Sequence, residues 1–466
     1  MDHSDYSKWS NRATEWGQRY LDTLSDQPVR PAVKPGEIAA KLPDHAPEAP
    51  EKMETILADF DRIVPGGMTH WQHPRFFAYF PTNASTPVMV AEQLATVMTA
   101  QCMLWQTSPA ATEVEGVVIG WLRDALGLAP HFSGTLQDTA TTATFSAILT
   151  MRERALNWTG LTDGMGGAKL RIYASGQTHS SVDKGVRLSG IGQNNLVKVP
   201  VDDDFAMQPD ALRRAIQADR AAGLTPAGVV VCVGGTSIGA TDNVKGCIAV
   251  AKEEGLYVHV DAAWAGNAML CEEFRPLWEG VDQADSIVFN PYKWLGAMSD
   301  CSVQFLADPT PQVNTLGLRP AYLETLGEEE VVNYNEWTIP LGRRFRALKL
   351  WFMLRAYGLS GLRDRIRNHV AWTAELAEVI RTLPGFRITT EPRLALFTFQ
   401  YAPEGGDADA LTEALLKKIN DDGRIYLTQT LHQGAFVVRV NVGPFDTTRD
   451  DVMMVAEVAA ELAKTL

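Results

Sequence analysis

The 466-residue sequence has no long hydrophobic run, no excess of basic charge and no regular spacing of cysteines. No stretch approaches the roughly 18 apolar residues that a membrane-spanning helix needs, and the N-terminal residues lack the apolar segment of a signal peptide. Asp and Glu together number 56 against 42 Lys and Arg, which gives a net charge of −14. Such a surface repels phosphate backbones. We therefore expect a soluble, cytoplasmic protein that binds neither nucleic acid nor membranes.

Common metal and nucleotide motifs are also missing. The five cysteines form no CxxC pair, and most lie in apolar runs such as GVVVCV, where Cys acts as a small core residue. His70 and His73 have no Cys or acidic cluster to complete a site, so no metal is expected. GMGGAK (164–169) and GIGQNN (190–195) do not complete G-x-G-x-x-G after a strand, and there is no Walker lysine. A nucleotide-binding enzyme is therefore disfavoured.

The chain divides into three predicted parts. Residues 1–85 read as an N-terminal helical and dimerisation segment, with a proline-rich linker at 28–50. Residues 86–360 alternate helical stretches with short β-rich runs, which predicts a mostly parallel sheet covered on both faces. Residues 361–466 read as a small C-terminal α/β domain. The first part is too short to bury a core of its own, so we expect it to pack across a partner subunit.

An aspartate and a lysine follow neighbouring buried runs of the predicted sheet. Asp261 ends LYVHVD, and Lys293 follows SIVFN. In open parallel sheets, ligands bind outside the carboxyl ends of the strands. A lysine amine can form a Schiff base with the aldehyde of pyridoxal 5′-phosphate (PLP), and an aspartate can keep the pyridine nitrogen protonated. On these two residues alone, a strand-end acid and a surface lysine, both common in α/β proteins, are the favoured interpretation.

Three further segments favour the PLP interpretation. SGQTHSSVDKG (175–185) puts His179 at the start of a predicted helix, where its ring could lie on the cofactor opposite Ala263. Thr139, Ala140 and Thr141 open another predicted helix, whose free N–H groups suit a phosphate. The third segment, HPRFFAYFPTNAS (73–85), is an aromatic run. Taken singly, each has an ordinary structural explanation: a structural histidine, a threonine cap and core packing.

Together the motifs resemble those of the group II PLP-dependent amino-acid decarboxylases, most closely the aromatic-L-amino-acid decarboxylases. The resemblance runs from about residue 5 to the end and rests on these motifs: HPRFFAYFPT, SPAATEVE, QTHSSVDKG, HVDAAWAG, CEEFR, FNPYKW and IPLGRRFRALKLWF. It implies the aspartate aminotransferase-like fold (fold type I) with a seven-stranded, mostly parallel sheet. It also implies a homodimer with active sites at the interface, and decarboxylation of an aromatic L-amino acid to the arylalkylamine and CO2.

The resemblance also implies roles for individual residues. Lys293 would be the Schiff-base lysine, Asp261 the partner of the pyridine nitrogen, and Tyr322 the proton donor on a mobile loop at 317–338. The remaining cofactor-binding residues would be Thr139, Ala140, Thr141, His179, Thr236, Ala263, Asn290 and Tyr292. The substrate side would be lined by Trp71, Tyr79, Phe80, Pro81, Thr82 and Gly342.

One position departs from the family pattern, and alternatives stay open. The family usually has NPHKW, whereas this chain has Tyr292, a phenol that does not become cationic. A catalytically dead scaffold is disfavoured because Lys293, Asp261, His179 and Tyr322 are all present. An oxidative aldehyde synthase and a decarboxylase of a non-aromatic amino acid remain alternatives. The sequence does not rank the aromatic amino acids, although Gly342 leaves room for a wide ring.

Overall fold

The computed structural model describes residues 2–318 and 331–466, which form two compact units. The large unit comprises Thr82–Ala371 and Pro392–Phe397. The small unit comprises Met1–Pro81, Trp372–Glu391 and Thr398–Leu466. Tyr322 of the predicted loop lies outside the described residues.

The large unit is built on a seven-stranded sheet of order β1-β7-β6-β5-β4-β2-β3. Strands β2 to β6 pair in parallel, whereas β7 is antiparallel to both β6 and β1. The mostly parallel seven-stranded sheet predicted from the sequence is therefore confirmed. The strands are β1 (Ser133–Gln137), β2 (Leu170–Ser175), β3 (Leu196–Val199), β4 (Thr225–Cys232), β5 (Tyr257–Asp261), β6 (Ser286–Phe289) and β7 (Ser302–Leu306).

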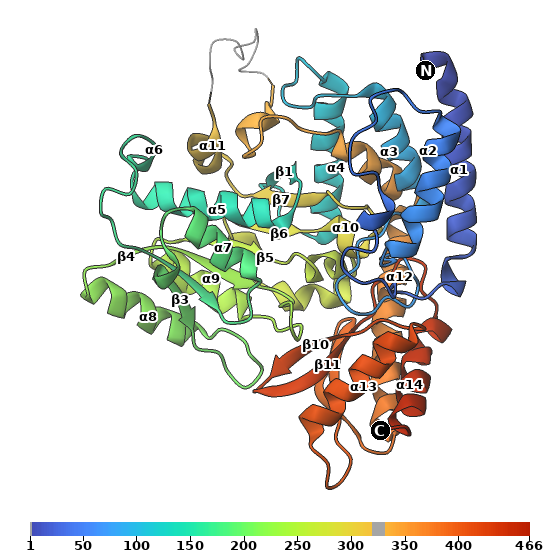
Figure 1. Ribbon diagram of the computed structural model, residues 1–466. Helices are drawn as coiled ribbons and strands as arrows, with labels where there is room; N and C mark the ends of the chain where they lie inside the picture. Colours follow the sequence, from blue (N-terminus) through green and yellow to red (C-terminus); the bar gives the residue numbers. More distant parts are fainter. Residues whose placement is uncertain (1, 319–330) are drawn as a thin grey trace. The chain divides into compact units, whose positions relative to one another are not determined.

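Helices of the large unit follow the strands in an α/β pattern. Helix α5 runs along strands β4 to β7 (Figure 1). Its residues Ala147 and Ile148 share a buried cluster with Val182 of α7 and Ile172 of β2. The helices are α3 (Thr86–Met98), α4 (Pro109–Leu126), α5 (Ala140–Ala155), α6 (Gly160–Asp163), α7 (Ser180–Leu188), α8 (Pro209–Ala221), α9 (Val244–Glu253), α10 (Pro291–Trp294) and α11 (Thr310–Leu316). Because helices cover the faces of the sheet, polar side chains lie mainly at the ends of the strands.

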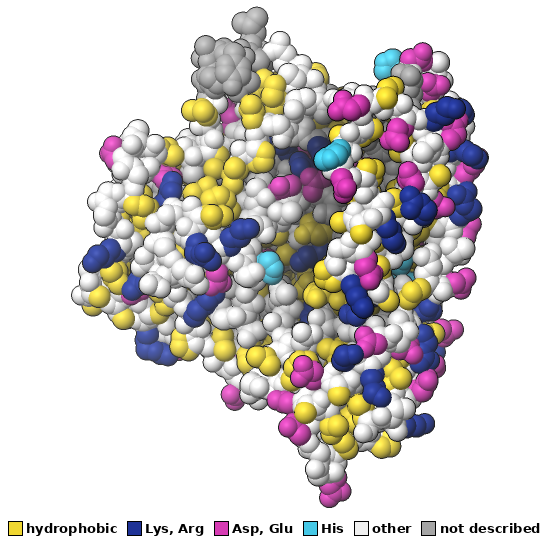
Figure 2. All heavy atoms as spheres, viewed as in Figure 1, with side chains coloured by type: hydrophobic (Ala, Val, Ile, Leu, Met, Phe, Trp, Pro, Cys, Tyr) yellow, Lys and Arg dark blue, Asp and Glu magenta, His cyan; other side chains and the backbone are white. Residues whose placement is uncertain are grey.

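The small unit holds both termini and a four-stranded sheet of order β10-β11-β9-β8. Its C-terminal helix begins with a capping box, in which Thr448 and Asp451 bond each other's backbone N–H groups. Charges of both signs alternate over its first two helices in Figure 2, and Lys8 pairs with Glu54 between them. The elements are α1 (Tyr6–Asp22), α2 (Met53–Ile63), β8 (Phe386–Arg393), β9 (Leu396–Tyr401), α13 (Ala408–Asp422), β10 (Thr428–His432), β11 (Ala435–Asn441) and α14 (Arg449–Ala463).

Helix α12 (Arg346–Thr382) supplies residues to both units. Gly358 interrupts this helix with a non-helical backbone, at φ 63°. A left-handed φ of this kind suits glycine, which has no Cβ to clash. Across residues 2–318 and 331–466, no helix has both the length and the apolar character required to cross a bilayer.

Candidate active site

Asp261 is the last residue of the central strand β5, which pairs with β4 and β6. Its side chain is 6% exposed, and its Oδ1 accepts the N–H of Ala263 at 3.0 Å. This bond forms because the chain turns sharply after the strand and brings the amide two residues later back to the carboxylate. The carboxylate is thus held at the carboxyl end of the sheet in one orientation.

Lys293 follows the neighbouring strand β6 and lies in the one-turn helix α10. Asn290 caps this turn, and its own N–H donates to the carbonyl of Ala263 at 2.9 Å. Asn267 Nδ2 donates to the carbonyl of Asn290 at 3.1 Å. The turn that carries Lys293 is therefore bonded directly to the turn that follows Asp261.

His179 is the N-cap residue of α7, so its ring sits where β2 gives way to that helix. Its Nδ1 accepts the N–H of Ser181 at 3.1 Å. Burial lowers the pKa of His179, while the charge of Asp261 raises it and that of Lys293 lowers it further. The imidazole therefore lies within electrostatic reach of both residues.

The first turn of α5 lies close to this group. Ala140 and Ala143 pack against Val288 of β6, and Ala263 packs against the same cluster. Thr139 caps the helix by accepting the N–H of Thr142. The N–H groups at the first helical positions, Ala140 and Thr141, have no intrahelical acceptor, and the helix dipole favours an anion there.

An acidic residue also lies at this helix terminus. Asp138 Oδ1 accepts the N–H of Thr139 at 2.8 Å and the hydroxyl of Thr142. These two donors offset part of the negative charge of the Asp138 carboxylate. The predicted anion site therefore depends on N–H groups and hydroxyls, with a carboxylate bound beside them.

Tyr292 and Asn290 form a second polar pair next to Lys293. Asn290 Nδ2 donates to the Tyr292 hydroxyl at 3.0 Å, and Ser302 Oγ donates to Asn290 Oδ1 at 2.6 Å. Burial, followed by the charge of Asp261, raises the pKa of Tyr292 to about 12. The phenol thus stays protonated and can donate its own proton to a ligand.

Thr236 is an exposed residue in the otherwise largely buried loop that follows β4. Two glycines bring this loop close to its neighbours. A Cβ on Gly234 would come within 2.4 Å of Ala265 Cβ, and one on Gly235 within 2.9 Å of the Gln177 carbonyl. The loop therefore lies against the turn after Asp261 and against the segment leading to His179.

Most of the residues predicted to bind a cofactor lie close together in the large unit. They are Thr139, Ala140, Thr141, His179, Asp261, Ala263, Asn290, Tyr292 and Lys293. Among the described residues, no group of three or more His, Cys, Asp or Glu side chains is arranged for a metal. His70 bonds the Tyr20 hydroxyl at 2.8 Å, and His73 bonds the Gln27 carbonyl at 3.1 Å. Both histidines thus tie together parts of the small unit.

Residues 73–81 of the aromatic run belong to the small unit, whereas residues 82–85 belong to the large one. Trp71 stacks on Tyr79 with ring centroids 5.9 Å apart, and these rings are 38% and 45% exposed. Phe80 lies under the buried Arg439 guanidinium, 4.5 Å away, and Pro81 packs where Gly443 has no side chain. The rings of Trp71 and Tyr79 are therefore partly exposed to solvent, whereas Phe80 and Pro81 pack against other residues of the small unit.

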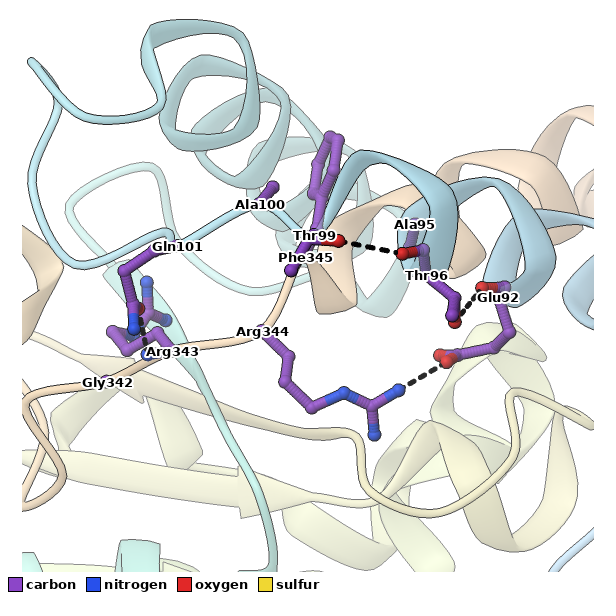
Figure 3. Close-up of a pocket in the computed structure, with 10 residues that line it drawn as sticks. All are labelled: Glu92, Ala95, Thr96, Thr99, Ala100, Gln101, Gly342, Arg343, Arg344 and Phe345. Carbon is purple, nitrogen blue, oxygen red and sulfur yellow. Dashed lines mark hydrogen bonds and ion pairs between the residues drawn. The ribbon is translucent and has the colours of Figure 1, made fainter. Parts of the chain in front are cut away.

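Gly342 lies in a groove of about 380 Å³ in the large unit, shown in Figure 3. The groove is lined from the end of α3 and from residues 342–345, and Arg344 crosses it to pair with Glu92. A Cβ at 342 would approach Gln101 Nε2 to 3.2 Å. Asp261, His179 and Lys293 do not line this groove.

The sequence analysis missed His259, which points to the same face of β5 as Asp261, two residues away. Its ring bonds Ser286 Oγ at 3.0 Å and Thr144 Oγ1 at 3.2 Å, and burial lowers its pKa to about 4. It therefore links strands β5 and β6 to helix α5 as a neutral side chain. The two-residue alternation of a strand was the signal that could have revealed it.

Comparisons with known proteins find related sequences and related structures. The family described as the pyridoxal-dependent decarboxylase conserved domain matches residues 35–402. Aromatic-L-amino-acid decarboxylase of Rattus norvegicus is 37% identical over 457 residues, covering 95% of this chain and 94% of that protein. The Oryza sativa TDC structure with PLP and tryptamine has a TM-score of 0.96 at 32% identity, and covers 100% of this chain and 99% of that one. The 4-hydroxyphenylacetaldehyde synthase of Rhodiola rosea has a TM-score of 0.93 at 34% identity, with the same coverage.

Proposed function

Because the chain belongs to the pyridoxal-dependent decarboxylase family, we propose that it converts an aromatic L-amino acid to the corresponding arylalkylamine and CO2. One observation carries the proposal within this chain. The charges of Asp261 and Lys293 both act on the imidazole of His179, so the three groups share one site. PLP is the cofactor of this family, and these side chains are those that its ring and aldehyde require.

The donor set fits PLP. Lys293 supplies an amine for the aldehyde, and Asp261, already oriented by the Ala263 N–H, supplies a carboxylate for the ring nitrogen. The phosphate would be held by the first turn of α5 (Thr139, Ala140 and Thr141) together with Asn290 and Tyr292, and Thr236 would lie close to the cofactor. His179 and Ala263 would contact the two faces of the ring.

When bound, PLP supplies an electron-withdrawing ring that takes up the electron pair left by CO2. Asp261 keeps a proton on the ring nitrogen, which strengthens that withdrawal. His179 is neutral near pH 7 because burial lowers its pKa, so it orients the substrate carboxylate without adding a positive charge that would retain it. Tyr322 would return a proton to the α-carbon. It lies outside the described residues, so this role rests on the family resemblance.

An aromatic substrate is supported by the residues proposed for the substrate side: Trp71, Tyr79, Phe80, Pro81, Thr82 and Gly342. The exposed faces of Trp71 and Tyr79 suit a flat apolar ring. The likeness to an aldehyde synthase keeps oxidative deamination as a second candidate. The presence of both His179 and Tyr322 favours decarboxylation, because family members with aldehyde products typically replace one of these two.

We also propose that the protein is a homodimer with active sites at the interface. Helix α3 exposes Val90, Leu94 and Val97, which share one helical face. The end of the same helix lines the groove that contains Gly342. A second copy packed on this face would therefore reach Gly342. In the small unit, Trp9, Trp16 and Phe60 line a groove of about 480 Å³ that a partner could also fill.

The test is to incubate the purified protein with PLP and each aromatic amino acid, and to measure amine, CO2, aldehyde and hydrogen peroxide. Amine and CO2 in equal amounts support the proposal. Aldehyde with peroxide instead would identify an oxidative enzyme. The cytoplasmic location and the division into 1–85, 86–360 and 361–466 stay predictions, to be tested by fractionation and by limited proteolysis.

A further inference from the structure

The helix that carries Lys293 is too short to fix the lysine by itself. Helix α10 spans only Pro291–Trp294, and its closing bond runs from the Leu295 N–H to the Pro291 carbonyl at 3.0 Å. A single helical turn is intrinsically unstable because it fixes several dihedral angles for one hydrogen bond. Contacts from other elements must therefore set the direction in which the lysine side chain leaves the turn.

Trp294, the residue after Lys293, provides one such contact. Its ring is 1% exposed and stacks on Trp264 with centroids 5.2 Å apart and an interplanar angle of 16°. Trp264 lies three residues after Asp261 and is also buried. The stacked pair thus joins the turn that carries the lysine to the turn that carries the aspartate.

His369 holds this stack from a distant part of the chain. It lies on α12, 75 residues beyond Trp294, and its Nδ1 accepts the indole N–H at 2.9 Å. Trp294 donates through a single N–H, so this bond sets the rotation of the indole about its stack. Burial, reinforced by the charge of Arg365, lowers the pKa of His369 to about 3, which keeps the imidazole neutral and able to accept.

We propose that His369 is a positioning residue for Lys293: by accepting the indole N–H of Trp294 it fixes the Trp264–Trp294 stack, and so holds the lysine turn in register with Asp261. The inference rests on the proposed function only in taking Lys293 as the residue that bonds PLP. Without the acceptor, the buried N–H has to find another partner. The indole then rotates, and the adjacent lysine moves with it.

Three variants distinguish a role of His369 in positioning Lys293 from a contribution to the stability of the fold alone. His369→Leu removes the acceptor and keeps an apolar volume, whereas His369→Asn keeps an acceptor near the position of Nδ1. Ile366→Ala lies one turn earlier on the same helix and removes a fully buried side chain without touching the bond. It is the matched control for loss of stability.

The readout is the rate at which added PLP becomes fixed to Lys293 of the cofactor-free protein, measured by borohydride quenching and peptide mapping alongside Tm. A misplaced reacting group can cost up to about 100-fold in rate, so we expect about 10-fold slower fixation in His369→Leu and less than about 3-fold in His369→Asn. Ile366→Ala should lower Tm and leave the rate at the wild-type value. Wild-type fixation by His369→Leu, or equal slowing by Ile366→Ala at equal Tm, overturns the proposal.

If His369→Leu does not fold, Trp294→Phe tests the same bond from the donor side. It keeps an aromatic ring for the stack and removes the N–H, so it should also slow fixation about 10-fold; an unchanged rate contradicts the inference. Failure of the proposed function looks different, because then the wild-type protein itself would acquire no label on Lys293.

Discussion

The lysine site and the aromatic run are held in very different ways. Asp261, Lys293 and Asn290 are tied by backbone and side-chain bonds within one unit, and the neighbouring Trp294 is almost fully buried. Trp71 and Tyr79 instead expose more than a third of their surface, and Gly342 lines an open groove. The chain thus bonds the residues around the lysine to one another, and leaves exposed three of the residues proposed for the substrate side: Trp71, Tyr79 and Gly342.

Replacing Lys293 should abolish activity while leaving the fold intact. Lys293→Ala removes the amine that bonds the cofactor, and loss of a central catalytic group of this kind costs on the order of 10⁴-fold in kcat. Amine formation measures the loss, and Tm checks the fold. Borohydride reduction of the wild-type protein should label a peptide containing Lys293; reduced cofactor on any other peptide would contradict the assignment.

Tyr322→Phe should change the product as well as the rate. Phenylalanine keeps the ring but cannot protonate the α-carbon, so amine formation should fall about 10³-fold, within the range for general acids. Aldehyde, ammonia and hydrogen peroxide should appear, with consumption of oxygen. Wild-type amine production without peroxide would rule out the proton-donor role.

The same variant tests whether two copies share a site. If the tyrosine acts on the neighbouring subunit, a mixed dimer of Tyr322→Phe and Lys293→Ala contains one site with both native groups. Mixing the two inactive proteins should then restore part of the amine synthesis. No recovery in a verified heterodimer would place tyrosine and lysine on the same chain.

Asp261→Asn should slow the reaction about 100-fold, since a preorganised charge of this kind is worth ~3 kcal/mol in the transition state. The amide keeps the shape of the side chain, so Tm should change little. The cofactor should still be fixed to Lys293, which separates loss of electron withdrawal from loss of binding. A rate near wild type would show that the aspartate only stabilises the turn.

Gly342→Ser should have the smallest effect and act on selectivity alone. Its Cβ would meet the flexible end of Gln101, which can move, so folding should be preserved. If the open groove becomes part of a substrate pocket in the dimer, kcat/KM for tryptophan should fall about 10-fold relative to tyrosine, as expected for one added group in an apolar pocket. An unchanged ratio would remove Gly342 from the substrate side.

Local sequence signals predicted elements well where start and stop residues were explicit. Helix α4 begins at Pro109 and ends before Gly127 with φ 74°, which are residues typical of a helix start and a helix end. Strand β10 begins at Thr428, without such a signal. Its register is set by a two-residue turn in which Gln433 and Gly434 both have positive φ, and Gln is an uncommon signal for such a turn.

The active site was predictable to the extent that it lies at strand and helix ends. Asp261 and Lys293 could be paired because parallel strands end at the same edge of the sheet. The strand β1 and the side chains that support the site were not predicted. His369 lies on another element 75 residues from its partner, and no local pattern reports such a contact.

The one-turn helix that carries Lys293 has a consequence for protein engineering. A designer who transfers only Asn290–Trp294 to another scaffold would move the reactive amine without the side chains that orient it. Functional groups keep their geometry only when their supporting side chains come with them. A transferable unit would need Asn267, Trp264 and His369 as well, three residues from separate stretches of sequence. The smallest unit that could be transferred with Lys293 correctly oriented is therefore a set of residues that are close in space, and not a continuous peptide.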